Sequence, residues 1–229
     1  MTARSDWNWP GMIADWHRPT QCSMSELLEL HSRNPQVRLV RRAVDCVRAG
    51  GVIVYPTDSC YALGCALGDK AAMERIARIR ETDKDHHFTL VCRDLSEIAR
   101  YALVENWQYR LLRACTPGPY TFILAATREV PRRLQNPKRR TIGLRVPDHP
   151  VPLLLLEALG EPLMSSTLSL PGDSYPLTDA ADIYARLKHQ VDIVLDGGNC
   201  GLEPTTVVDL AGPAPVVVRL GKGDVARFG

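Results

Sequence analysis

Hydroxyl, carboxyl and phenol groups gather in residues 55–64, which read YPTDSCYALG. The apolar run 52–55 precedes them and predicts a short strand that is buried on both faces. Ligands of α/β proteins bind beyond the carboxyl ends of such strands, so Thr57, Asp58 and Ser59 lie where substrate-binding side chains are expected. A polar turn that only closes the strand would explain the same residues.

A second group of chemically active side chains is basic. Residues 128–145 hold seven arginines and lysines against one acid, which gives this segment a charge of +6 and leaves −4 for the rest of a chain whose net charge is +2. A basic surface on an acidic body is typical of proteins that bind a phosphate backbone, whereas a solvated basic helix and loop is the alternative. No aromatic residue is interleaved, so RNA binding here would depend on charge and shape. The candidate RNA-binding residues are Arg132, Arg133, Lys138, Arg139 and Arg140.

Histidines and cysteines give a weaker signal. His86 and His87 are adjacent and point apart on most backbones, so we expect a solvated loop and no metal site built from protein side chains. The seven cysteines form no CxxC or CxxH pair, which argues against a zinc knuckle or a disulfide framework and favours a reducing cytoplasm. Cys60 and Cys65 are interpreted as small buried residues.

The elements that must position these residues alternate between helices and strands. Apolar residues at helical spacing predict helices over 37–47, 69–80, 106–115, 151–159 and 179–187, and a further helix that begins at Asp94. Short apolar runs predict strands over 52–55, 88–92, 120–125, 141–146, 163–166, 191–195, 206–210 and 216–219. This order predicts an α/β (α+β) fold, in which helices flank a single-domain, twisted, open mixed sheet.

Composition and length exclude several classes of protein. The chain has 229 residues, of which 45% are hydrophobic and 24% charged, as in an ordinary soluble globular domain. The longest apolar run, 151–156, is far shorter than the roughly 18–20 residues of a membrane span, and the N-terminus lacks the apolar core of a signal peptide. We therefore expect a cytoplasmic protein with no membrane association. Residues 24–229 form the predicted domain, and residues 1–23, with three tryptophans, are either an appended extension or a tryptophan-rich contact arm.

Five sequence blocks resemble the YrdC-type threonylcarbamoyl-AMP synthase family, in the order of that family. They are GGVIVYPTDSCYALG at 50–64, PGPYTFIL at 117–124, GLRVPDHP at 143–150, TTVVD at 205–209 and VRLG at 218–221. The resemblance implies a YrdC/RibB-like fold that condenses L-threonine, bicarbonate and ATP into threonylcarbamoyl-AMP and pyrophosphate. It implies Mg²⁺ bound through the triphosphate, and downstream tRNA-modifying proteins that receive the product.

The same resemblance implies roles for individual residues. Arg80 and Arg145 would be the catalytic cations, and Lys222 a further cation around phosphates and carboxylates. Ser59 stands at the second threonine of the family's signature and would contact the amino acid. The substrate- and ATP-binding set comprises Ser59, Tyr61, Thr121, Thr167, Ser169, Thr205 and Arg219. The alternatives are structural ion pairs for Arg145 and Arg219, and a solvated side chain for Lys222.

Two departures from the family resemble its YciO-like branch. Residues 80–82 are Arg-Glu-Thr where the family carries Lys-x-Arg, and residues 167–169 are Thr-Leu-Ser where it carries Ser-x-Asn. Thr82 lacks the charge and five donors of an arginine, so we expect slow turnover unless Lys84, His86 or His87 supplies the cation. The alternatives are a double-stranded RNA- or tRNA-binding protein without efficient adenylation, and a related carbamoylation of a different substrate.

Overall fold

The structure, a computed structural model, describes residues 25–81, 88–136 and 138–228. Its strands are β1 (Glu26–Glu29), β2 (Ile53–Tyr55), β3 (Ala62–Ala66), β4 (Thr89–Val91), β5 (Tyr120–Ala125), β6 (Thr141–Arg145), β7 (Leu163–Thr167), β8 (Ile193–Asp196), β9 (Thr206–Asp209) and β10 (Val216–Arg219). Its helices are α1 (Val37–Arg48), α2 (Lys70–Arg80), α3 (Leu95–Tyr101), α4 (Asn106–Cys115), α5 (Pro150–Leu159) and α6 (Ala180–Leu187), with a 3-10 turn at Arg132–Leu134.

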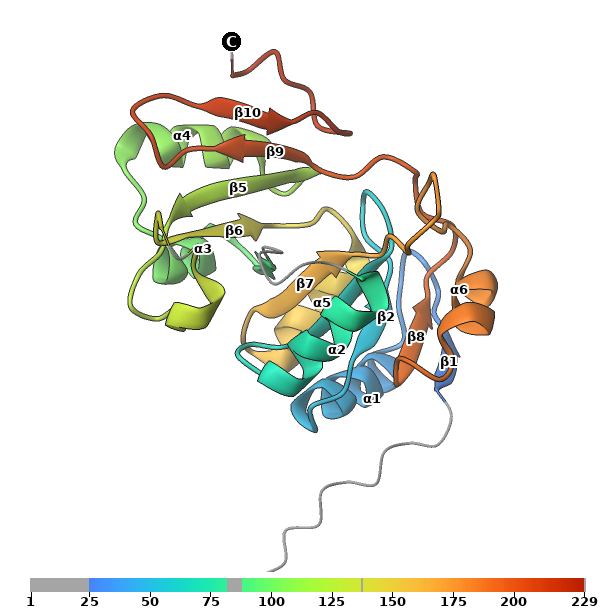
Figure 1. Cartoon of the computed structure of the whole chain (residues 1–229). Coiled ribbons are helices and arrows are strands. Elements are labelled where there is room, and N and C mark those ends of the chain that lie inside the picture. Colours follow the sequence, from blue (N-terminus) through green and yellow to red (C-terminus); the bar gives the residue numbers. More distant parts are fainter. Residues whose placement is uncertain (1–24, 82–87, 137, 229) are drawn as a thin grey trace, which may run out of the picture.

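All of these strands join one open mixed sheet in the order β1-β8-β2-β3-β7-β4-β6-β5-β9-β10 (Figure 1). The pairs β1–β8, β2–β8, β4–β6 and β5–β9 are parallel, and the remaining pairs are antiparallel. The mixed, helix-flanked sheet expected from the sequence is therefore confirmed.

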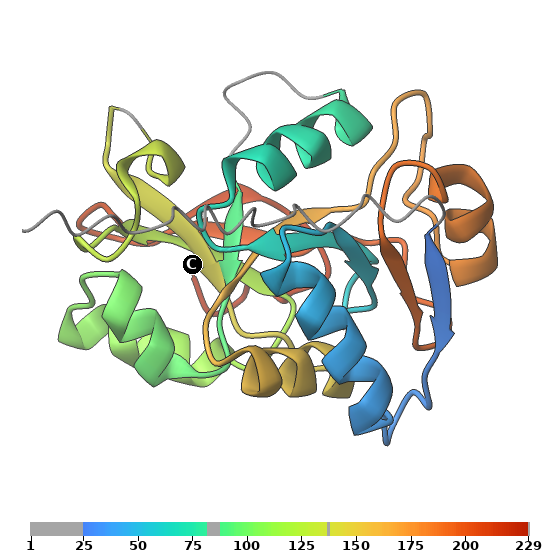
Figure 2. The same cartoon turned by 90° about the horizontal axis from the view of Figure 1, so that it is seen from below.

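Helices cover both faces of the sheet. Helices α1 and α5 lie together against one face, and α2 lies on the opposite face (Figure 2). On α1 the apolar spacing of the sequence produces the buried stripe, in which Val40, Val44 and Val47 are fully or almost fully buried. Asp69 caps α2 by accepting a hydrogen bond from the backbone N–H of Ala72 at 3.0 Å, and Asp94 caps α3 in the same way from Glu97 at 2.9 Å.

Two strands escaped the sequence analysis. Strand β1 lies at one edge of the sheet and pairs in parallel with β8, and β3 lies inside the sheet between β2 and β7. The β3 segment, ALGCA, has little intrinsic strand preference, and its two neighbours supply the pairing that holds it extended. The turn after β2 is therefore shorter than the sequence suggested, because the last residues of the segment 55–64 already belong to β3.

Several expectations fall outside the described residues. They are those on residues 1–23 and on Thr82, Lys84, His86 and His87. Over 25–81, 88–136 and 138–228, no helix combines the length and the apolar character needed to cross a lipid bilayer.

Candidate functional site

A cavity of about 1090 Å³ opens where the turn between β2 and β3 meets β6, β7 and the segment that carries β9 and β10. Of the ten residues that the resemblance assigned to catalysis or to binding of phosphates and substrates, all but Lys222 line it. The nine lining residues are Ser59, Tyr61, Arg80, Thr121, Arg145, Thr167, Ser169, Thr205 and Arg219. Its volume lies at the upper end of the range for small-molecule sites, which suits a ligand as large as a nucleotide together with a second substrate.

The ends of secondary-structure elements position the arginines of this cavity. Arg80 is the last residue of α2, Arg145 the last of β6 and Arg219 the last of β10. Their side chains leave a helix, an inner strand and an edge strand of the same fold, so three charges from distant parts of the chain converge on one space.

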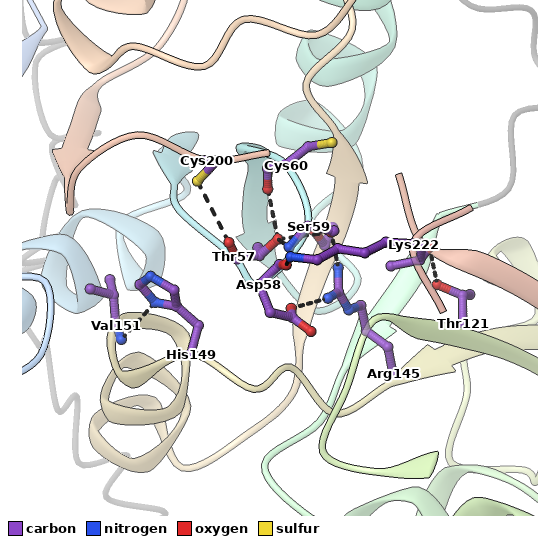
Figure 3. A network of polar contacts seen from close by, with 12 residues as sticks. Thr57, Asp58, Ser59, Cys60, Thr121, Arg145, His149, Val151, Cys200 and Lys222 are labelled. Carbon is purple, nitrogen blue, oxygen red and sulfur yellow. Dashed lines mark hydrogen bonds and ion pairs between the residues drawn. The ribbon is translucent and has the colours of Figure 1, made fainter. Parts of the chain in front are cut away.

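Arg145 is neutralised by a carboxylate. Its guanidinium forms an ion pair with Asp58 of the β2–β3 turn, and each of the two side chains is only 9% exposed (Figure 3). A second nitrogen of Arg145 lies 3.4 Å from the hydroxyl oxygen of Ser59. Asp58 Oδ2 and Arg145 Nε are buried without a hydrogen-bond partner in the described part of the chain. The structural ion pair that was the alternative for Arg145 is thus present, and Arg145 still lines the cavity.

Arg80 and Arg219 carry positive charge into another part of the cavity wall. Burial lowers the pKa of Arg80, and the nearby charge of Arg219 lowers it further, so the two guanidinium groups repel each other. Arg80 donates to the hydroxyl of Ser166, and Arg219 donates to the carbonyl oxygen of Thr205 at 2.8 Å. Two cations held together in a partly buried wall favour an anion between them.

Hydroxyl groups line the rest of this wall. Thr121 and Thr205 share a hydrogen bond of 2.9 Å between their side-chain oxygens, and Arg219 donates to Thr205 Oγ1 at 3.2 Å. Thr167 and Ser169 are half-buried, and their hydroxyls make no hydrogen bond to the described residues, so they are open to a ligand. Tyr61 is less open, because its hydroxyl donates to the carbonyl oxygen of Gly198 at 2.7 Å; burial raises the pKa of this phenol.

Lys222 reaches the same site from the C-terminal segment. Its ammonium donates to the backbone carbonyl of Asp58, which links the segment after β10 to the β2–β3 turn (Figure 3). The neighbouring Gly221 lies where a Cβ atom would be 2.3 Å from the Pro204 carbonyl oxygen, so only glycine fits this close approach. Lys222 is exposed, which agrees with the alternative interpretation of a solvated side chain. Its ammonium group nevertheless contacts the site.

The basic segment does not form one continuous ridge. Arg145 is buried, and Arg139 forms an ion pair with Asp209 and lines the cavity. Arg132, Lys138 and Arg140 are exposed and lie outside the residues that line the cavity. The side chain of Arg133 is not among those that the structure describes.

Four further residues of the site received no individual role in the sequence analysis. Asp209 pairs with Arg139, Cys200 contacts the Thr57 carbonyl through its thiol, and His149 caps α5 by accepting from the backbone N–H of Val151 at 3.2 Å. Burial lowers the pKa of His149. Thr57 organises the turn itself. Of these, Thr57, His149 and Asp209 stand inside the recognised sequence blocks, which was the one available signal. Among the described residues no group of three His, Cys, Asp or Glu side chains could hold a metal ion.

Comparison with known proteins identifies relatives over most of the chain. The model of the Sua5/YciO/YrdC family, described as "Telomere recombination", matches residues 45–221. The "Uncharacterized protein YciO" of Escherichia coli (strain K12) is 56% identical over 205 residues, which is 90% of this chain and 100% of that protein. A threonylcarbamoyl-AMP synthase of Nitrosococcus oceani is 33% identical over 159 residues, which is 69% of this chain and 85% of that enzyme.

Solved structures agree with these sequence matches. The crystal structure of E. coli YciO superposes with a TM-score of 0.86 at 56% identity and covers 90% of this chain and 100% of that one. The crystal structure of P. abyssi Sua5 complexed with L-threonine superposes with a TM-score of 0.79 at 24% identity, over 86% of this chain and 58% of that one. This second likeness shows the shared fold alone.

Proposed function

The chain belongs to the Sua5/YciO/YrdC family, and we propose that its cavity joins ATP and an N-carboxylated amino acid as a carbamoyl adenylate. The substrates in this proposal are L-threonine, bicarbonate and ATP, and the products are threonylcarbamoyl-AMP and pyrophosphate. The observation that carries the proposal is the convergence of Arg80, Arg145 and Arg219 on one cavity large enough for both substrates. The threonylcarbamoyl-AMP synthases among its relatives support the same chemistry.

In the proposed reaction, the amine of the amino acid combines with bicarbonate and loses water, which gives a carbamate. One carbamate oxygen then attacks the α-phosphorus of ATP. A new P–O bond forms, and the bond from the α-phosphorus to the oxygen that bridges it to the β-phosphorus breaks, so pyrophosphate leaves with the electron pair. The protein contributes no nucleophile to this step, and the rate depends on positioning and on neutralisation of charge.

Arg80 and Arg219 are the residues best placed to bind the phosphates. Both arginines line the cavity and the charge of Arg219 lowers the pKa of Arg80, so a polyanion between them would reduce their repulsion; guanidinium groups bind phosphate oxygens through two parallel hydrogen bonds. Thr121, Thr167 and Ser169 would supply hydroxyl contacts around the nucleotide and the amino acid. Mg²⁺ would enter with the triphosphate and take its oxygen ligands from phosphate and water.

Release of pyrophosphate tests the proposal. The full chain is incubated with ATP, Mg²⁺ and bicarbonate and with each amino acid in turn, and we expect L-threonine to stimulate release most, and only when bicarbonate is present. Arg219→Gln should lower kcat/KM about ten-fold or more, because a charge-assisted contact to the phosphates is lost. Arg113→Gln, an exposed arginine on α4, should leave it unchanged. If no amino acid raises release above background, the proposal is wrong.

The two departures from the family make the activity weak in this proposal. Arg80 keeps one of the family's two cations in the cavity, and Ser169 cannot make the paired contacts of an amide. Combining Thr82→Arg with Ser169→Asn should therefore raise the rate of pyrophosphate release. An unchanged rate would show that other residues already supply the missing contacts.

Binding of double-stranded RNA or tRNA is a second candidate function, and the exposure of Arg132, Lys138 and Arg140 favours it. These residues surround the turn that leads from the 3-10 turn at Arg132–Leu134 into β6. In this alternative the protein keeps the fold and binds RNA without efficient adenylation.

A further inference from the structure

The hydroxyl groups of the β2–β3 turn form a network whose protons can be assigned. Thr57 Oγ1 donates to the Cys60 carbonyl oxygen at 2.6 Å and accepts from the backbone N–H of Ser59 at 3.2 Å. The side-chain oxygens of Thr57 and Ser59 lie 3.1 Å apart. A hydroxyl group carries one proton and two lone pairs. Because Thr57 donates its hydroxyl proton to the Cys60 carbonyl oxygen, Ser59 is the donor in the hydrogen bond between the two hydroxyl groups.

Ser59 consequently has no proton left for a ligand. One of its two lone pairs accepts from Arg145 at 3.4 Å, and the other remains open on a residue that lines the cavity. Ser59 and Thr57 are only 3% and 4% exposed, so bulk water does not compete for this position or reorient the network. The turn therefore offers an acceptor, and not a donor, to whatever binds beside it.

We propose that Ser59 accepts a hydrogen bond from an N–H group of the substrate, and that Thr57 is a positioning residue that holds the Ser59 hydroxyl in this orientation. The inference rests on the proposed function, in which the amino acid keeps one N–H after its amine is carboxylated. The carboxylate and carbamate oxygens are acceptors only, and an acceptor lone pair repels them; the other donor of the amino acid is the threonine hydroxyl, which the N-methyl comparison below separates from the N–H. The amino-acid nitrogen thus lies beside the β2–β3 turn, and the carbamate oxygens are left for the cations of the cavity.

The charge around Ser59 agrees with this assignment. Asp58, the residue before Ser59, neutralises Arg145, so the arginine that is nearest to Ser59 does not present a free cation. An N–H donor is compatible with this neutral end of the cavity, and Arg80 and Arg219 line the same cavity as candidate partners for phosphate oxygens.

The test compares L-threonine with N-methyl-L-threonine, whose carbamate has no N–H. For the wild type we expect kcat/KM for pyrophosphate release to fall about ten-fold with the N-methyl compound, because a buried acceptor is left unpaired. In Ser59→Ala and in Thr57→Val the two compounds should differ by less than about three-fold, since the oriented acceptor is absent. Thr57→Ser keeps the hydroxyl and should restore the ten-fold preference.

Thr127→Val is the matched control. Thr127 donates to the Arg100 carbonyl at 2.8 Å and accepts from the N–H of Glu129 at 3.3 Å, the same local pattern as Thr57, and it lies outside the cavity lining. It should retain the wild-type preference. If Ser59→Ala keeps the full preference, or if Thr57→Ser loses it like Thr57→Val, the inference is overturned.

Calorimetry separates this inference from the proposed function. Binding of L-threonine and of 3-hydroxybutanoate, which has no nitrogen, is measured for each variant without ATP. Free N-methyl-L-threonine is not used here, because its ammonium form keeps two N–H donors. A wild-type preference for L-threonine that Ser59→Ala reduces supports the inference even if no pyrophosphate is released. Release of pyrophosphate without any change of preference in Ser59→Ala supports the function and overturns the inference. A wild type that binds neither compound overturns the inference as well.

Discussion

The buried ion pair between Asp58 and Arg145 makes a single carboxylate important for the site. Each side chain is only 9% exposed, so removing one partner leaves a charge without compensation in a largely buried position. The Lys222 ammonium also contacts this residue, through the backbone carbonyl of Asp58. Asp58 therefore holds Arg145 with its side chain and the C-terminal segment with its backbone.

Asp58→Asn should lower the free energy of unfolding by about 3–5 kcal/mol at neutral pH, because Arg145 loses its counter-charge. The double variant Asp58→Asn with Arg145→Met should lose less, since no buried charge remains. Denaturant unfolding measures both. As a control, Asp173→Asn removes the partner of Arg186 from a more exposed pair and should cost no more than about 1 kcal/mol. Equal losses for Asp58→Asn and Asp173→Asn would contradict this account of the pair.

Among the elements, β3 depends on a glycine. A Cβ atom on Gly64 would lie 2.6 Å from Leu163 Cδ2 and 2.9 Å from Tyr55 Cε1, in a part of the core where both neighbours are almost fully buried. Gly64→Ala should therefore destabilise the protein by about 1–3 kcal/mol through overpacking. Thermal or denaturant unfolding measures the loss. At Gly212 a Cβ would meet only the Ala214 carbonyl oxygen, at 3.9 Å, so Gly212→Ala should have a much smaller effect. A free energy of unfolding for Gly64→Ala equal to that of the wild type would show that the neighbouring side chains or strands move to make room for the methyl group.

The sequence predicted those elements whose pattern is local. The helical spacing of apolar residues predicted α1 and α2, and Asp69, the first residue of the second predicted helix, is the residue that caps α2. Strand β3 was not predictable in this way, because Ala, Gly and Cys favour it only once β2 and β7 lie on either side.

The candidate site shows the same division between local and long-range information. The sequence blocks supplied the nine predicted residues, and the sheet order brings them to one cavity. The partners of the charged residues could not be predicted, because Asp58 and Arg145 are 87 positions apart in the sequence, and Arg139 and Asp209 are 70 apart. Such pairs depend on which strands become neighbours.

At the scale of the whole molecule, buried thiols and a buried phenol make the free energy of unfolding depend on pH in the alkaline range. Burial raises the pKa of Cys65 from 9.0 to about 12, that of Cys60 to about 11 and that of Tyr55 to about 12. The unfolded chain releases these protons at lower pH than the folded chain does, so folding becomes less favourable as pH rises. The stabilisation is complete below the unfolded pKa values and is lost progressively above about pH 9.

Replacing Cys65 should make this dependence shallower. For a thiol with these two pKa values, about 2 kcal/mol of stability is lost between pH 8 and pH 10.5. Denaturant unfolding of the wild type and of Cys65→Ala across this range measures the difference. The variant should be less stable at pH 8, because a small cavity is created, and its stability should fall less steeply. Parallel curves would show that the Cys65 thiol does not titrate in the unfolding equilibrium.

The division of the basic segment sharpens the test of RNA binding. Arg132, Lys138 and Arg140 are exposed outside the cavity lining and available to a phosphate backbone, whereas Arg139, although exposed, pairs with Asp209 and lines the cavity. Reversing these three exposed charges to glutamate should weaken binding of tRNA or duplex RNA at least ten-fold at low salt and reduce the dependence of affinity on salt. Filter binding or fluorescence anisotropy at several salt concentrations gives both quantities.

Charge reversal of Arg110, Arg113 and Lys188, which are exposed elsewhere on the protein, is the control. It changes the net charge equally and should have a smaller effect. Equal losses in the two triple variants would mean that RNA responds to the overall charge of the protein and not to this surface.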